Sequence, residues 1–171
     1  MKINKILNKR FSIFIVSSVI IIIICIFATE TIKNSDFVND YVYVDTDNLQ
    51  IIYKNGTKNA KNSGYPLSFQ QGKEESDINL IEIVNKQDFS TSFSLCVREF
   101  DASSNTLSMD KIYFDVNNNS SGTLSEDNKC FYTDTIDKKG KMILNVRLWA
   151  GSDLVTNEDQ GKSINLEFYV K

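Results

Sequence analysis

Residues 141–170, KMILNVRLWAGSDLVTNEDQGKSINLEFYV, decide the fold class of this chain. At both ends of the stretch, in 141–149 and 163–170, apolar and polar residues alternate with a period of two. That period is typical of a strand that packs one face on a core and leaves the other in solvent. The stretch therefore predicts two half-buried antiparallel strands. Their apolar faces are Met142, Leu144, Val146 and Leu148 in the first and Ile164, Leu166, Phe168 and Val170 in the second.

The polar interval between these two strands, residues 150–162, is predicted to be the loop of a final hairpin. It contains two glycines and several side chains that favour turns. We expect Asp153, Glu158 and Asp159 to face solvent there. The charges of the interval then belong to a loop surface and not to a catalytic site.

Trp149 lies on the polar face of the first strand, together with Arg147 and Ile143. We expect the indole to pack at a sheet edge. The alternative is a recognition aromatic with the Arg147 guanidinium stacked on its ring.

Six further segments have the composition of short strands, rich in aromatic and β-branched residues. They are 41–45, 49–53, 77–85, 92–100, 111–116 and 129–133. Segment 58–71 holds the only proline, Pro66, and is predicted to connect the two sheets with a short edge strand at 67–69. No segment after residue 28 has a helical period. The pattern predicts an all-β domain, a single antiparallel two-sheet β-sandwich that is Ig-like or jelly-roll.

The N-terminal part has the composition of a membrane anchor. Residues 11–28 are 18 consecutive residues without a charge, long enough to cross a bilayer as one helix. Residues 1–10 carry four basic side chains and no acidic one, and basic flanks stay on the cytoplasmic side. We therefore predict a cytoplasmic segment 1–10, a transmembrane helix 11–28, a stalk 29–39 and an extracellular domain 40–171. The alternative is a signal peptide cleaved after Ala28, with a secreted product.

The charge of the exported part limits its partners. All 22 acidic residues follow residue 28, against 15 basic ones, so this part has a net charge of −7. Nucleic acid and anionic lipid surfaces are poor partners for such a charge. The predicted membrane contact is therefore the apolar segment 11–28 and not the domain surface.

The sequence lacks several features that catalytic sites commonly need. The chain contains no histidine, which excludes Ser-His and Cys-His nucleophiles and most zinc sites. No glycine-rich phosphate loop follows a strand, and nothing singles out a carboxylate pair among the acidic residues. The sequence therefore predicts a protein that is not an enzyme and has no catalytic residue, cofactor or metal.

One weak metal pattern lies in the polar loop predicted at 117–128. Its oxygen-bearing residues have the spacing of a calcium loop, with a late carboxylate. Ser120 stands where such a loop needs glycine for its sharp turn. We expect a solvated hairpin loop and keep the calcium site as the alternative. The residues concerned are Asp115, Asn117, Asn119, Ser121 and Glu126.

Two of the three cysteines, Cys96 and Cys130, lie in strand-like segments of the exported part. Exported cysteine pairs often form disulfides. A bridge between neighbouring strands is one reading of this pair. Two buried free thiols are the other, because the sequence does not show whether the Cα atoms approach closely enough.

Four stretches carry a family resemblance. They are DNLQIIYKNGT (47–57), YPLSFQQGK (65–73), INLIEIVNK (78–86) and NVRLWAGSDLVTNEDQGKSINLEFYV (145–170). In this order they resemble a family of small exported Gram-positive proteins with an N-terminal hydrophobic segment and one β-sandwich. More distantly the chain is similar to the TasA and camelysin group, which includes secreted subunits of biofilm-matrix fibres. The AYFSDT-like segment of that group is replaced here by IFATET at 26–31.

Two hypotheses about function remain. The resemblance implies a non-enzymatic structural or assembly protein of the cell surface, of the biofilm-matrix or surface-fibre kind, that associates with itself or another surface protein through sheet edges. The alternative is a monomeric, membrane-anchored module that binds a glycan or a protein partner with its loops. We favour the first because no loop of the sequence resembles a formed ligand site.

Overall fold

The computed structural model describes residues 41–171 except 61, 63 and 101–104. The predicted cytoplasmic segment 1–10, transmembrane helix 11–28 and stalk 29–39 lie outside the described residues. Within the described ranges, no helix has the length and apolar composition needed to cross a membrane. Residues Asp40–Lys171 form one compact unit.

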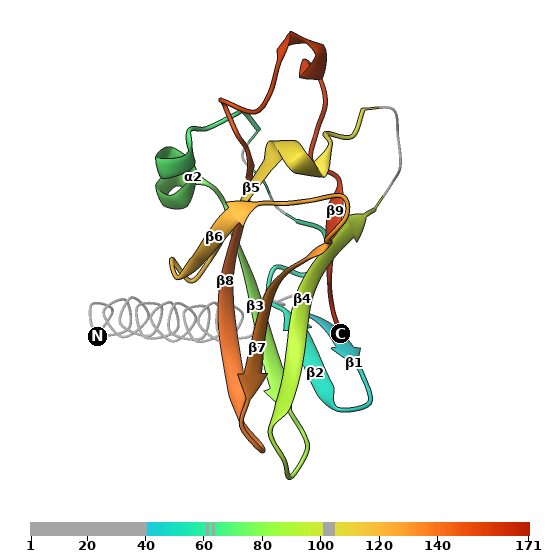
Figure 1. Cartoon of the computed structure of the whole chain (residues 1–171). Helices are drawn as coiled ribbons and strands as arrows, with labels where there is room; N and C mark the ends of the chain where they lie inside the picture. Colours follow the sequence, from blue (N-terminus) through green and yellow to red (C-terminus); the bar gives the residue numbers. More distant parts are fainter. Residues whose placement is uncertain (1–40, 61, 63, 101–104) are drawn as a thin grey trace, which may run out of the picture. The chain divides into compact units, whose positions relative to one another are not determined.

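In the described residues, nine strands form two antiparallel sheets (Figure 1). The large sheet has the strand order β1-β2-β3-β8-β5-β6, and the small sheet has the order β7-β4-β9. The strands are β1 (Val42–Asp45), β2 (Leu49–Tyr53), β3 (Ile78–Asn85), β4 (Thr91–Glu99), β5 (Ile112–Val116), β6 (Ser120–Thr123), β7 (Cys130–Ile136), β8 (Lys141–Ala150) and β9 (Leu166–Val170). All eight predicted strands are present, and β6 is an addition to them.

The core lies between the two sheets and follows the period of the sequence. Leu144, Val146 and Leu148 of β8 are completely buried, and Leu166 and Phe168 of β9 are almost completely buried. They belong to one apolar cluster to which both sheets contribute. Two antiparallel sheets around one core are consistent with the predicted β-sandwich.

The last two strands do not form a hairpin, so that prediction is wrong. β8 lies inside the large sheet between β3 and β5, whereas β9 pairs with β4 in the small sheet. The interval between them therefore passes from one sheet to the other. Alternation shows which face of a strand is buried but does not identify the strand that pairs with it. This is why the pattern suggested a hairpin between two consecutive strands.

The segment before β3 contains a short helix, α2 (Phe69–Glu75), where an edge strand was expected at 67–69. Leu67 makes only an isolated bridge to Gly151. Ser68 then caps the helix: its side chain accepts from the Gln71 backbone N–H, and the Gln71 side chain accepts from the Ser68 N–H. This capping box is visible in the sequence as Ser68-x-x-Gln71 and could have predicted the helix start.

Helix α2 covers one end of the large sheet's outer face and buries Trp149 there. Trp149 has no exposed surface, and its ring lies so close to Gly72 that a Cβ at residue 72 would overlap the indole. Lys73 of the helix reaches Asp115 of β5 at 3.3 Å. The expected position of Trp149 at a sheet edge is therefore wrong, because β8 is an inner strand and α2 lies over it.

The predicted polar loop 117–128 is shorter than expected because its middle is strand β6. Val116 pairs with Ser120, and the turn between them places Asn117 and Asn118 at φ 53° and 57°. Asparagine tolerates this left-handed region better than most residues. A strand of sequence SSGT has no apolar alternation, which explains why the period did not reveal it.

Candidate functional site

The interval between β8 and β9 lies at the same end of the unit as α2 (Figure 1). It forms one wall of a cavity. The cavity has a volume of about 350 Å³. Tyr65 and Pro66, which precede α2, line it on another side. Leu107 and Ile164 are buried apolar residues of the lining. Three segments that are distant in the sequence therefore meet here, which no local pattern could reveal.

Asp159 anchors the polar wall of this cavity. It lies at the end of the short helix η2 (Asn157–Asp159), and its side chain is only 4% exposed. Its Oδ2 accepts from Lys111 Nζ at 2.5 Å, and its Oδ1 accepts from Lys162 Nζ at 2.9 Å. The Thr156 backbone N–H and hydroxyl also donate to Oδ2, at 2.9 and 3.1 Å. The prediction that Asp159 faces solvent is wrong, whereas Asp153 and Glu158 are exposed as expected.

These contacts favour the ionised form of the Asp159 carboxyl. The Lys111 ammonium, followed by that of Lys162 and the Thr156 backbone N–H, holds the pKa of the carboxyl far below its usual value of 3.8. The carboxylate and the ammonium groups thus stabilise one another and join the interval to the segment around Lys111. The spacing Thr156-x-x-Asp159 resembles a capping box, but Lys111 has no signal in the sequence because it lies 48 residues away.

We call the contacts of Asp159 with Lys111, Lys162 and Thr156 the Asp159 network, and we expect this network to make the stability of the protein sensitive to acid. A carboxyl whose pKa is lowered by folding stabilises the folded state above its usual pKa, and this contribution is lost as the pH falls below that value. Asp159→Asn should therefore melt at a lower temperature than the wild type at neutral pH, and the difference should shrink below pH 3.8. Thermal unfolding followed by circular dichroism between pH ~7 and ~2 measures this difference.

Glu158→Gln is the matched control because Glu158 is the exposed neighbour of Asp159 in the same short helix. Its melting curve should follow the wild type at each pH. A constant difference between Asp159→Asn and the wild type across the pH range would contradict the network.

Three residues of the calcium-loop pattern have different partners within the protein. Asp115 is buried and faces Lys73, and its Oδ2 accepts from the Asn118 backbone N–H at 3.0 Å. Glu126 accepts from the Met109 backbone N–H at 2.9 Å, before β5. Asn117 extends the ladder of β8: its Oδ1 accepts from the Asn145 N–H at 2.8 Å.

The polar groups of Asp115, Asn117 and Glu126 thus have hydrogen-bond partners within the protein. Ser121 lies on β6, and Asn119 belongs to the turn before it. Among the residues that the structure describes, no group of three or more His, Cys, Asp or Glu side chains could hold a metal ion.

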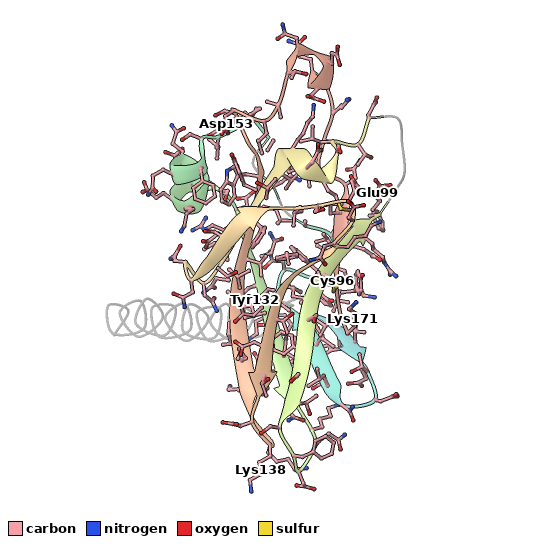
Figure 2. All side chains as sticks on the ribbon, viewed as in Figure 1. Cys96, Glu99, Tyr132, Lys138, Asp153 and Lys171 are labelled. Carbon is pink, nitrogen blue, oxygen red and sulfur yellow. A yellow bond between two sulfur atoms is a disulfide. The ribbon has the colours of Figure 1, made fainter. Side chains whose placement is uncertain are left out.

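Cys96 and Cys130 are joined by a disulfide, with an S–S distance of 2.10 Å. They lie opposite each other on β4 and β7 of the small sheet, and Figure 2 labels Cys96. Cys96 is completely buried and Cys130 is half-buried. The bond therefore fixes two neighbouring strands and is structural in position.

Comparisons with known proteins found no matching family model, no matching curated protein and no matching solved structure. The resemblance to exported Gram-positive β-sandwich proteins and to the TasA and camelysin group stays a prediction.

Proposed function

We propose that the protein is a non-enzymatic structural or assembly protein of the cell surface, and that it associates with a second copy of itself through the outer face of the large sheet. The predicted anchor at 11–28 would hold it at the membrane, facing outward. The observation that carries the proposal is the apolar character of this outer face. The resemblance to matrix-fibre proteins supports it.

The outer face displays apolar side chains across several strands. Tyr43, Ile78 and Ile143 are 58%, 42% and 44% exposed. One cross-strand row contains Tyr43, Ile52, Glu82 and Ile143, so three of its four members are apolar or aromatic. The outer face of an antiparallel sheet in a monomer is usually polar. Exposed apolar side chains on several strands of one face favour a protein partner.

The charges on this face suit a second copy of the same chain. Glu82 pairs with Lys54 at 2.5 Å and has Lys141 at 4.0 Å. Nearby, Asp45 of β1 pairs with Lys86 at 2.8 Å. Because these acidic groups are each paired with a lysine, the face carries both signs and is open to a second copy with the same charges.

The strand edges differ in how well they are protected, and β1 is the edge that adjoins this face. Residues 58–60 cover β9: the Ala60 N–H donates to the Leu166 carbonyl and the Phe168 N–H to the Lys58 carbonyl, both at 2.8 Å. In β7, the Asp134 carboxylate accepts from the Thr135 N–H at 2.7 Å and so occupies an edge donor. Within the described residues β1 pairs with β2 alone. We assign the self-association to the β1 side of the large sheet.

Light scattering and negative-stain imaging of residues 40–171 across a wide range of concentration test the proposal. We expect the mean mass to rise with concentration and Ile143→Arg to suppress the rise, because a charge would be buried between the copies. Phe89→Arg is the matched control: Phe89 is 57% exposed but lies in the loop between β3 and β4. A wild-type protein that stays monomeric at every concentration would refute self-association.

A further inference from the structure

The cavity between the β8–β9 interval and Tyr65 has the dimensions of a ligand site. Its volume of about 350 Å³ lies within the range of ~300–1,000 Å³ that is typical of small-molecule pockets. Its buried apolar lining comes from Leu107, Ala150 and Ile164. It shares no residue with the apolar outer face of the large sheet. A ligand here would thus be independent of self-association.

The charged groups of the lining compensate each other. Asp159 already accepts from Lys111, Lys162 and Thr156 on its two carboxylate oxygens, so most of its acceptor capacity is used within the protein. Lys162 is the cation of the lining and is already paired with Asp159. A ligand with a net charge would meet no uncompensated partner, which disfavours charged compounds.

The remaining lining suits a compound rich in hydroxyl groups. Gln160 and Ser163 carry an amide and a hydroxyl group that can both donate and accept hydrogen bonds. Tyr65 is 63% exposed and adjoins Pro66, so an aromatic ring stands at the mouth of the cavity. Sugars present one apolar ring face and a rim of hydroxyls, which match an aromatic wall and side chains of this kind.

We propose that this cavity is a binding site for a neutral saccharide of one or two rings. Tyr65 packs against the apolar face of a sugar ring, and Gln160 and Ser163 bind its hydroxyls. The Asp159 network keeps the wall in its binding conformation before the ligand arrives, which lowers the entropic cost of binding.

Titration of residues 40–171 with glucose, galactose, N-acetylglucosamine and the disaccharides cellobiose, lactose and chitobiose, followed by NMR chemical shifts, tests the site. We expect saturable shifts confined to the cavity lining for at least one of these sugars. Tyr65→Ala should weaken that binding by about tenfold, the usual cost of removing an aromatic contact at a binding site. Glucuronate and glucosamine, as charged analogues, should bind more weakly than the neutral sugars.

Tyr43→Ala is the matched control because Tyr43 is a similarly exposed tyrosine, 58% against 63%, on the outer face of the large sheet. It should leave sugar binding unchanged and reduce self-association, whereas Tyr65→Ala should do the reverse. The proposal is overturned if no sugar causes saturable shifts, if a charged analogue binds more tightly than its neutral parent, or if Tyr65→Ala binds sugar as well as the wild type. None of these outcomes bears on self-association, which the light-scattering experiment decides.

Discussion

Replacing Cys96 and Cys130 together by alanine is expected to lower the free energy of unfolding by about 4 kcal/mol. The two cysteines are 34 residues apart, and the bond restricts the unfolded chain over that distance. The loss comes mainly from the freedom that the unfolded chain regains. Urea unfolding of residues 40–171, oxidised wild type against the double variant, measures the difference. This region contains no other cysteine, so no alternative bridge can form within one molecule.

The neighbouring cross-strand pair on the same two strands provides the control. Ser94 Oγ and Thr133 Oγ1 lie 3.0 Å apart and are hydrogen-bonded without a covalent bond. Replacing both by alanine should cost less than about 1 kcal/mol, the usual range of a cross-strand pair. If the two double variants lose the same stability, or if a reducing agent leaves the wild type unchanged, the disulfide does not stabilise the domain as expected.

Asn85→Asp is expected to cost about 3 kcal/mol at neutral pH, although it changes the shape of the side chain very little. Asn85 is 1% exposed and ends β3. Its Nδ2 donates to three backbone carbonyls, and its Oδ1 accepts from a backbone N–H. The partners are the carbonyls of Phe89 at 2.8 Å, Ile136 at 3.2 Å and Asp137 at 3.1 Å, and the N–H of Gln87 at 2.9 Å.

A carboxylate at position 85 would place an oxygen opposite these carbonyl oxygens and could not donate a hydrogen bond to them. The loops after β3 and after β7 would lose the hydrogen bonds that join them, because Asn85 binds both. Chemical unfolding and hydrogen exchange of the two loops measure the effect, and faster exchange in both loops together is the expected signature. Asn157→Asp is the control at an exposed position of the β8–β9 interval and should cost less than about 0.5 kcal/mol. An Asn85→Asp variant as stable as this control would contradict the role assigned to Asn85.

The strands were predictable because alternation is a local property of the sequence. Leu144 and Phe168 are buried as their period requires. The partners of the strands were not predictable in the same way, since a strand with one apolar face fits several neighbours. Trp149 illustrates the limit: it lies on the face that alternation assigns to solvent, and a helix from a distant segment buries it.

The candidate site was less predictable than the fold. The acidic residues of the β8–β9 interval looked alike in the sequence, yet Asp159 is buried and Glu158 is exposed. The difference depends on Lys111, which lies beside Gly151 at the start of the interval because β5 pairs with β8. Kinds of site that the composition excludes were more direct to predict, because a chain without histidine cannot build a site that requires one.

The central ladder of the large sheet joins β3 to β8, two strands that are separated by more than fifty residues of chain. A polypeptide that emerges from a ribosome can pair β1, β2 and β3 before β8 has appeared. During that time the backbone N–H and C=O groups along one edge of β3 have no partner strand nearby in the sequence. That edge stays unpaired until β8 arrives, and β8 then joins β3 to β5 and completes the large sheet.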